Sequence, residues 1–83
     1  MTNEQLMQTV QDVAVEVLNV ERAAVTATAS FKDDLDADSL DLVELVMALE
    51  ERLDITVPEA ELEQISTVGD AVEMLAAKVG AAA

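Results

Sequence analysis

Apolar side chains recur at helical spacing in several stretches of the chain, most clearly in the stretch that begins at Ser39. There the apolar positions fall at i, i+3, i+4, i+7 and i+11, which is typical of a helix packed on a hydrophobic core. These positions are Leu42, Leu45, Val46, Leu49 and Leu53. Asp38 or Ser39 can serve as the N-cap, so the pattern predicts that this helix begins at Ser39.

The same helix carries a second apolar stripe, formed by Leu40, Val43 and Met47. It lies more than about 100° around the helix from the first stripe. Acidic residues lie between and beside its members: Asp41, Glu44, Glu50, Glu51 and Asp54. Since one stripe is enough to bind a helix to a core, the second stripe indicates a further role at the surface.

The N-terminal stretch predicts a helix over about 3–18. Thr2 and Gln5 have the spacing of a capping box, and an apolar stripe follows them. The stripe consists of Leu6, Val10, Val13, Ala14 and Val17.

A last helix is predicted over about 68–79, where residues 67–70 again have a capping-box pattern. Its expected inner face consists of Ala71, Val72, Leu75, Ala76 and Val79. Gly80 is the expected C-terminal stop, and residues 81–83 should fray.

Two connections lie between these helices. The first spans 19–38, far longer than the usual connection of about 4 to 6 residues, so we expect Val25 and Phe31 to anchor it to the core. After the central helix the chain should run extended until Pro58, which opens a short helical segment near 59–64. The inward-facing residues expected around this segment are Val57, Ile65 and Val68.

Length, composition and net charge limit the classes of protein to which this chain can belong. Eighty-three residues make one domain over 1–83, and 18 acidic against 4 basic residues give a net charge of −14. Such a charge argues against binding nucleic acid or anionic membranes and favours partners with basic surfaces. The segment 33–63 holds twelve of the acids and a single base, Arg52. The chain has no cysteine and lacks the apolar run of a membrane span or signal peptide, so we expect it in the cytoplasm. We also expect it to be a monomer.

The chain has no histidine and no cysteine, which excludes Ser-His-Asp and Cys-His catalysis and argues against an enzyme. Asp34, Asp36 and Asp38 have the spacing of the first ligands of a calcium loop. In that register, however, Ser39 stands where the loop needs glycine and Leu45 where it needs a bidentate glutamate. We therefore expect weak, adventitious binding of divalent ions at most, and no dedicated metal site.

The run DSLDLVELVMALEERLDITVP resembles the prosthetic-group segment of acyl carrier proteins, whose Asp-Ser-Leu serine bears 4′-phosphopantetheine. The resemblance covers the whole chain, including FKDDL before this run and ISTVGDA after it. It implies an all-α fold, a small four-helix bundle with three longer helices, one short helix and a long first loop. It also implies that Ser39, flanked by Asp38 and Leu40, is the attachment site.

Three features of Ser39 agree with an acceptor that another protein modifies. It lies at a helix N-terminus, whose amides and dipole stabilise a phosphodiester. It follows a long loop that can leave it exposed, and it has no neighbouring base that would make it a nucleophile unaided. Without the resemblance, the same position would fit a simple helix cap.

The resemblance also gives the second stripe a function, because the matching positions in the family dock onto basic patches of partner enzymes. The implied docking residues are Asp41, Val43, Glu44, Met47, Glu50 and Glu51. The implied partners are a phosphopantetheinyl transferase and the enzymes of fatty acid synthesis. The phrase VELVMALEE favours the fatty-acid type, and a carrier of a polyketide pathway is the alternative. An acidic calcium-binding or interaction module is the alternative from a different class, and metal titration of unmodified protein would separate the two.

Overall fold

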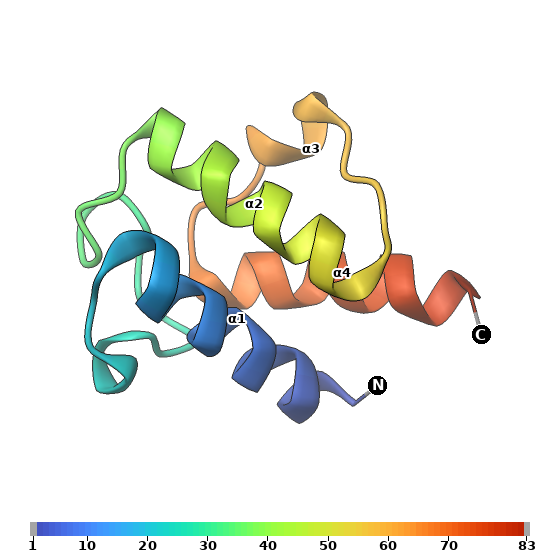
Figure 1. Cartoon of the computed structure of the whole chain (residues 1–83), viewed down its shortest axis with the longest axis horizontal. Helices are drawn as coiled ribbons and strands as arrows, with labels where there is room; N and C mark the ends of the chain where they lie inside the picture. Colours follow the sequence, from blue (N-terminus) through green and yellow to red (C-terminus); the bar gives the residue numbers. More distant parts are fainter. Residues whose placement is uncertain (1, 83) are drawn as a thin grey trace.

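The computed structural model describes residues 2–82, which form a bundle of α-helices (Figure 1). Its elements are α1 (Asn3–Leu18), a 3₁₀ helix η1 (Arg22–Ala24), α2 (Ser39–Leu53), α3 (Glu59–Leu62) and α4 (Val68–Ala82). Helix α1 packs against both α2 and α4, so it is the central contact of the bundle. The predicted all-α fold, with three longer helices, one short helix and a long first loop, is confirmed.

Helix α1 has the predicted bounds because local hydrogen bonds define its start. The Gln5 N–H donates to Thr2 Oγ1 at 3.1 Å, and the Thr2 N–H donates to Gln5 Oε1 at 2.9 Å, which completes the capping box. Asn19 ends the helix in the left-handed conformation, with φ of 56°. The residues of α1 that are buried are Leu6, Val10, Val13 and Ala14.

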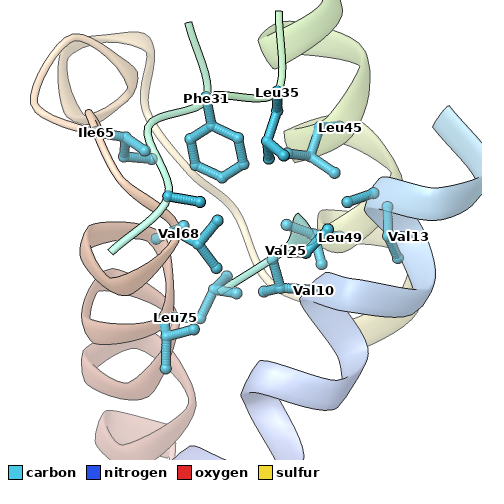
Figure 2. Close-up of a cluster of buried hydrophobic side chains, with 14 of the residues drawn as sticks. Val10, Val13, Val25, Phe31, Leu35, Leu45, Leu49, Ile65, Val68 and Leu75 are labelled. Carbon is cyan, nitrogen blue, oxygen red and sulfur yellow. The ribbon is translucent and has the colours of Figure 1, made fainter. Parts of the chain in front are cut away.

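The hydrophobic core includes side chains from the long first loop as well as from the helices (Figure 2). Val25 is completely buried and Phe31 is 2% exposed, so both predicted anchors of the loop are confirmed. Leu35 and Ala37 extend this buried run towards the start of α2. The largest fully buried side chains are Leu6, Leu45, Leu49, Leu75, Val10, Val13, Val25 and Val68.

The long first loop is also joined to the start of α4 by backbone hydrogen bonds. Ser30 and Thr67 form an isolated antiparallel bridge, in which the Phe31 N–H donates to the Ser66 carbonyl at 3.0 Å. The Val68 N–H donates to the Ala29 carbonyl at 2.9 Å. These hydrogen bonds attach residues 29–31 of the loop to residues 66–68, and they position the chain where it leads towards α2.

Helix α2 presents two faces, as its sequence predicts. Leu45, Val46 and Leu49 are buried, and Leu42 and Leu53 are partly buried beside them. On the other stripe, Leu40 is 65%, Met47 58% and Val43 37% exposed. The core stripe and the outer stripe are both confirmed.

Two predicted helix ends are wrong. Helix α3 ends at Leu62 rather than near Gln64, because the Gln64 and Ile65 amides bond to carbonyls three residues back, which tightens the chain into a turn. Helix α4 continues past Gly80 to Ala82. Gly80 lies within the helix, so it provides no left-handed stop, and alanine, which follows it, has the highest helix propensity. Ala83, for which fraying was predicted, lies outside the described residues.

Candidate functional site

Asp38 caps α2 and determines where the helix begins. The Asp41 N–H donates to Asp38 Oδ1 at 2.9 Å, and the Asp38 N–H donates to Asp41 Oδ2 at 3.3 Å. This is a reciprocal capping box built from two aspartates. The sequence left Asp38 and Ser39 as alternative caps, and the structure assigns the cap to Asp38.

Ser39 is consequently the first residue of the helix, and its hydroxyl is not used for capping. The residue is exposed, and within residues 2–82 its side chain forms no hydrogen bond. The first amides of a helix have no partner within the helix, so the start of α2 also offers free N–H groups and the positive end of the helix dipole. These amides and the helix dipole would stabilise an anion attached to this hydroxyl.

The segment before Asp38 is ordered by its own backbone contacts. Asp34 Oδ2 accepts the Ser30 N–H at 2.6 Å, and the Asp34 and Leu35 amides both donate to the Ser30 carbonyl. The Ala37 N–H donates to the Phe31 carbonyl at 2.8 Å. The chain therefore turns tightly between the buried Phe31 and Asp38 and leads into α2, which begins at one end of the bundle (Figure 1). The first residue of α2, Ser39, is exposed.

Two hollows flank Ser39. One has a volume of about 310 Å³ and lies between the start of α2, the loop around Phe31 and the turn at Ser66. The other, of about 440 Å³, lies between α2 and α3. Four residues line both hollows: Lys32, Ser39, Leu42 and Ile65. Of these the sequence singled out Ser39 for a functional role. It assigned no role to Lys32, which is the only base between Arg22 and Arg52.

The docking residues predicted on α2 differ in their surroundings. Val43 and Met47 are exposed, and the carboxylates of Glu44 and Glu51 lie beside them in solvent. Glu50 is half-buried, and its Oε2 accepts the Val57 N–H at 2.9 Å. Asp41 is half-buried within the capping box. Two of the predicted acids therefore also have a structural role in holding the ends of α2.

The aspartates with calcium-loop spacing are not brought together as ligands. Asp34 and Asp38 direct carboxylate oxygens at backbone amides, those of Ser30 and Asp41. Asp36 is exposed and has left-handed backbone, with φ of 53°. Over the part of the chain that the structure describes, no group of three or more acidic, histidine or cysteine side chains is arranged to hold a metal ion.

Comparison with known proteins points to one family. The model of the family described as "Phosphopantetheine attachment site" matches residues 8–75. Acyl carrier protein of Prochlorococcus marinus (strain MIT 9515) is 50% identical over 80 residues, which are 96% of this chain and 100% of that protein. Acyl carrier protein of Petrotoga mobilis (strain DSM 10674 / SJ95) is 47% identical over 95% of this chain and 93% of its own length. Acyl carrier protein of Picosynechococcus sp. (strain ATCC 27264 / PCC 7002 / PR-6) is 46% identical, over 95% of this chain and 98% of its own length.

The match therefore defines a phosphopantetheine-binding carrier domain rather than an enzyme. The chain belongs to the acyl carrier protein family, whose members bear a covalently attached 4′-phosphopantetheine. The residues present fit such a group, because an exposed and unbonded serine hydroxyl lies at a helix N-terminus that can stabilise a phosphodiester. The structure also shows that no helix within residues 2–82 has the length and apolar character needed to cross a membrane.

Proposed function

We propose that Ser39 Oγ carries the 4′-phosphopantetheine and that the protein transports acyl groups between the enzymes of fatty acid biosynthesis. The observation that carries the proposal is that Asp38, and not Ser39, provides the N-cap of α2. Since Asp38 caps the helix, the Ser39 hydroxyl is left exposed and without a hydrogen bond at the positive end of α2. The prosthetic group supplies a terminal thiol for thioester formation, in a chain that has no cysteine of its own.

The other two serines are less suited to attachment. Ser30 is half-buried, and its Oγ accepts the Asp33 N–H at 3.2 Å. Ser66 lies in the turn before α4, where its backbone is bonded to Asp70 and Phe31. Neither serine begins a long helix.

Incubation with coenzyme A, Mg²⁺ and a phosphopantetheinyl transferase tests the attachment. Intact mass should show one added group on the native sequence and on Ser30→Ala and Ser66→Ala, whereas Ser39→Ala should remain unmodified. Peptide mapping should locate the group on Ser39. An adduct on Ser30 or Ser66 would refute the assignment.

The exposed stripe of Leu40, Val43 and Met47 is the proposed docking surface for the transferase and the acyl-transferring enzymes. Apolar side chains at its centre and acids around it suit a partner with a basic patch and an apolar contact. The acids concerned are Asp41, Glu44, Glu50 and Glu51.

The fatty acid pathway is favoured by the VELVMALEE run and by relatives that bear the name acyl carrier protein. The intact mass of protein purified from its native host tests this choice, because it reports what the prosthetic group carries. Straight saturated or β-hydroxyacyl chains would agree with fatty acid biosynthesis. Multiply oxygenated poly-β-keto chains would instead assign the carrier to a polyketide pathway.

A further inference from the structure

Lys32 and Ser39 share a surface. Lys32 lines both of the hollows that flank Ser39, the one beside Phe31 and the one between α2 and α3. Lys32 is exposed and belongs to the tightly wound segment that precedes Asp38. Lys32 and Ser39 therefore border the same two hollows at the surface.

The charge around Ser39 is otherwise negative. Asp33 and Asp38 line the first hollow, and Glu59 and Glu63 line the second. Attachment of 4′-phosphopantetheine adds a phosphodiester anion to this acidic surrounding. Like charges closer than the Debye length of about 8 to 10 Å repel one another, so a nearby cation would stabilise the modified protein.

Lys32 is available for that purpose. Each of the other three bases within the described residues is paired with a carboxylate: Arg22 with Asp12, Arg52 with Glu16 and Lys78 with Glu61. Lys32 forms no ion pair with any carboxylate in residues 2–82. A lysine ammonium is a compact charge on a flexible stem, and lysine is a common ligand of phosphate groups.

We propose that the Lys32 ammonium binds the phosphodiester of the prosthetic group on Ser39 and offsets the repulsion from the surrounding carboxylates. The inference rests on the proposed attachment at Ser39 and goes beyond it, because it assigns a second binding residue that touches the phosphate. The proposed ligand of Lys32 is the phosphodiester, so the inference does not depend on which acyl chain the protein carries.

The test compares apo and modified protein for four sequences: native, Lys32→Met, Lys32→Arg and Arg22→Gln. Modified samples are made with coenzyme A, Mg²⁺ and a transferase, and a chelator then removes the Mg²⁺, which could itself bridge phosphate and carboxylates. Intact mass and peptide mapping establish one group on Ser39 in each sample before melting. A group found on another serine overturns the Ser39 attachment at this stage, independently of any effect of Lys32.

The readout is the change in Tm on modification at low ionic strength. In Lys32→Met this change should be more negative than in the native sequence by about 2 to 4 °C, the size expected of one exposed ion pair in so small a domain. Lys32→Arg keeps the charge and should behave like the native protein. Arg22→Gln removes a charge from a residue that lines neither hollow. Its change in Tm on modification should equal that of the native sequence. The Lys32→Met effect should disappear at about 1 M salt.

Equal changes in Tm for the native sequence and Lys32→Met would overturn the inference. It would also be overturned if Lys32→Arg behaved like Lys32→Met, because the effect would then not come from charge. A matching loss in Arg22→Gln would show that any positive charge suffices and that Lys32 has no specific place beside the phosphate.

Discussion

Gly69 lies directly against the backbone carbonyl of Ala27. The Gly69 N–H donates to the Ala27 oxygen at 2.9 Å, and a Cβ on Gly69 would lie only 2.9 Å from that same oxygen. This contact closes the junction between the long first loop and the start of α4. A side chain at residue 69 would have to displace the backbone of the first loop at Ala27.

Gly69→Ala should therefore destabilise the protein, although alanine is normally the better helix residue. Crowding against a carbonyl costs about 1 to 3 kcal/mol, which outweighs the gain of up to about 1 kcal/mol in helix propensity. Thermal melts should show a lower Tm for Gly69→Ala. Ala77→Gly, at an exposed position of the same helix, is the control and should cost about 1 kcal/mol through propensity alone. A higher Tm for Gly69→Ala would show that the loop can yield.

The junction at Gly69 was not predictable from sequence, whereas the helix starts nearby were. Capping boxes are local patterns of four residues, so those at Thr2 and Thr67 could be recognised directly. The pairing of Ser30 with Thr67 depends on two segments that meet only in the folded protein. The position of Lys32 beside Ser39 depends on the same winding of the loop.

Hydrogen bonds between a side chain of one element and the backbone of another segment also could not be predicted from the sequence. Periodicity predicted which residues of α2 face the core and which face solvent, because both stripes follow from helix geometry. It could not predict that Glu50 accepts a hydrogen bond from the Val57 backbone. Glycine often ends a helix, but the alanines that follow Gly80 favour continuation of α4, so the helix does not end there.

Asp36 has left-handed backbone, with φ of 53°, a conformation that favours glycine. Asp36→Gly should raise the stability by about 0.5 to 1 kcal/mol relative to Asp36→Ala, because alanine has a Cβ and no side-chain oxygen that could stabilise the left-handed conformation. Both variants remove the same negative charge, so the difference between them isolates the backbone contribution. Chemical denaturation of the two variants measures it. Equal midpoints would indicate that a Cβ causes no strain at this position.

Asp70 makes the stability depend on pH. Hydrogen bonds from the Thr67 and Ser66 backbone amides, at 3.0 and 3.1 Å, hold the pKa of the Asp70 carboxyl below its ordinary value. A carboxyl with a depressed pKa stabilises the fold above its unfolded-state pKa of about 3.9, and this stabilisation is lost as the pH falls through the folded-state value.

Asp70→Asn should accordingly melt at a lower temperature than the native protein at pH 7, and the difference should shrink as the pH drops below about 4. The measurement is the difference in Tm between the two proteins at a series of pH values, which cancels the other carboxylates. A difference independent of pH would mean that Asp70 acts only as a neutral hydrogen-bond acceptor.

The two stripes of α2 predict opposite phenotypes. Leu49 is completely buried, so Leu49→Ala should cost about 2 to 5 kcal/mol, a large part of the stability of a domain of this size. Met47 is 58% exposed, and Met47→Ala should melt close to the native temperature. If the outer stripe docks partners, Met47→Ala should instead raise the KM of the transferase, since it removes an apolar contact at the centre of the interface.

Glu44→Lys tests the charge in the same experiment. Glu44 is exposed beside Met47, so its reversal should leave the fold intact and raise the KM most strongly at low salt, where attraction to a basic partner is least screened. Melts and transferase kinetics are measured on the same preparations of Leu49→Ala, Met47→Ala and Glu44→Lys. Were Met47→Ala to melt as early as Leu49→Ala, with unchanged kinetics for the folded fraction, the outer stripe would be part of the core and the docking surface would have to be sought elsewhere.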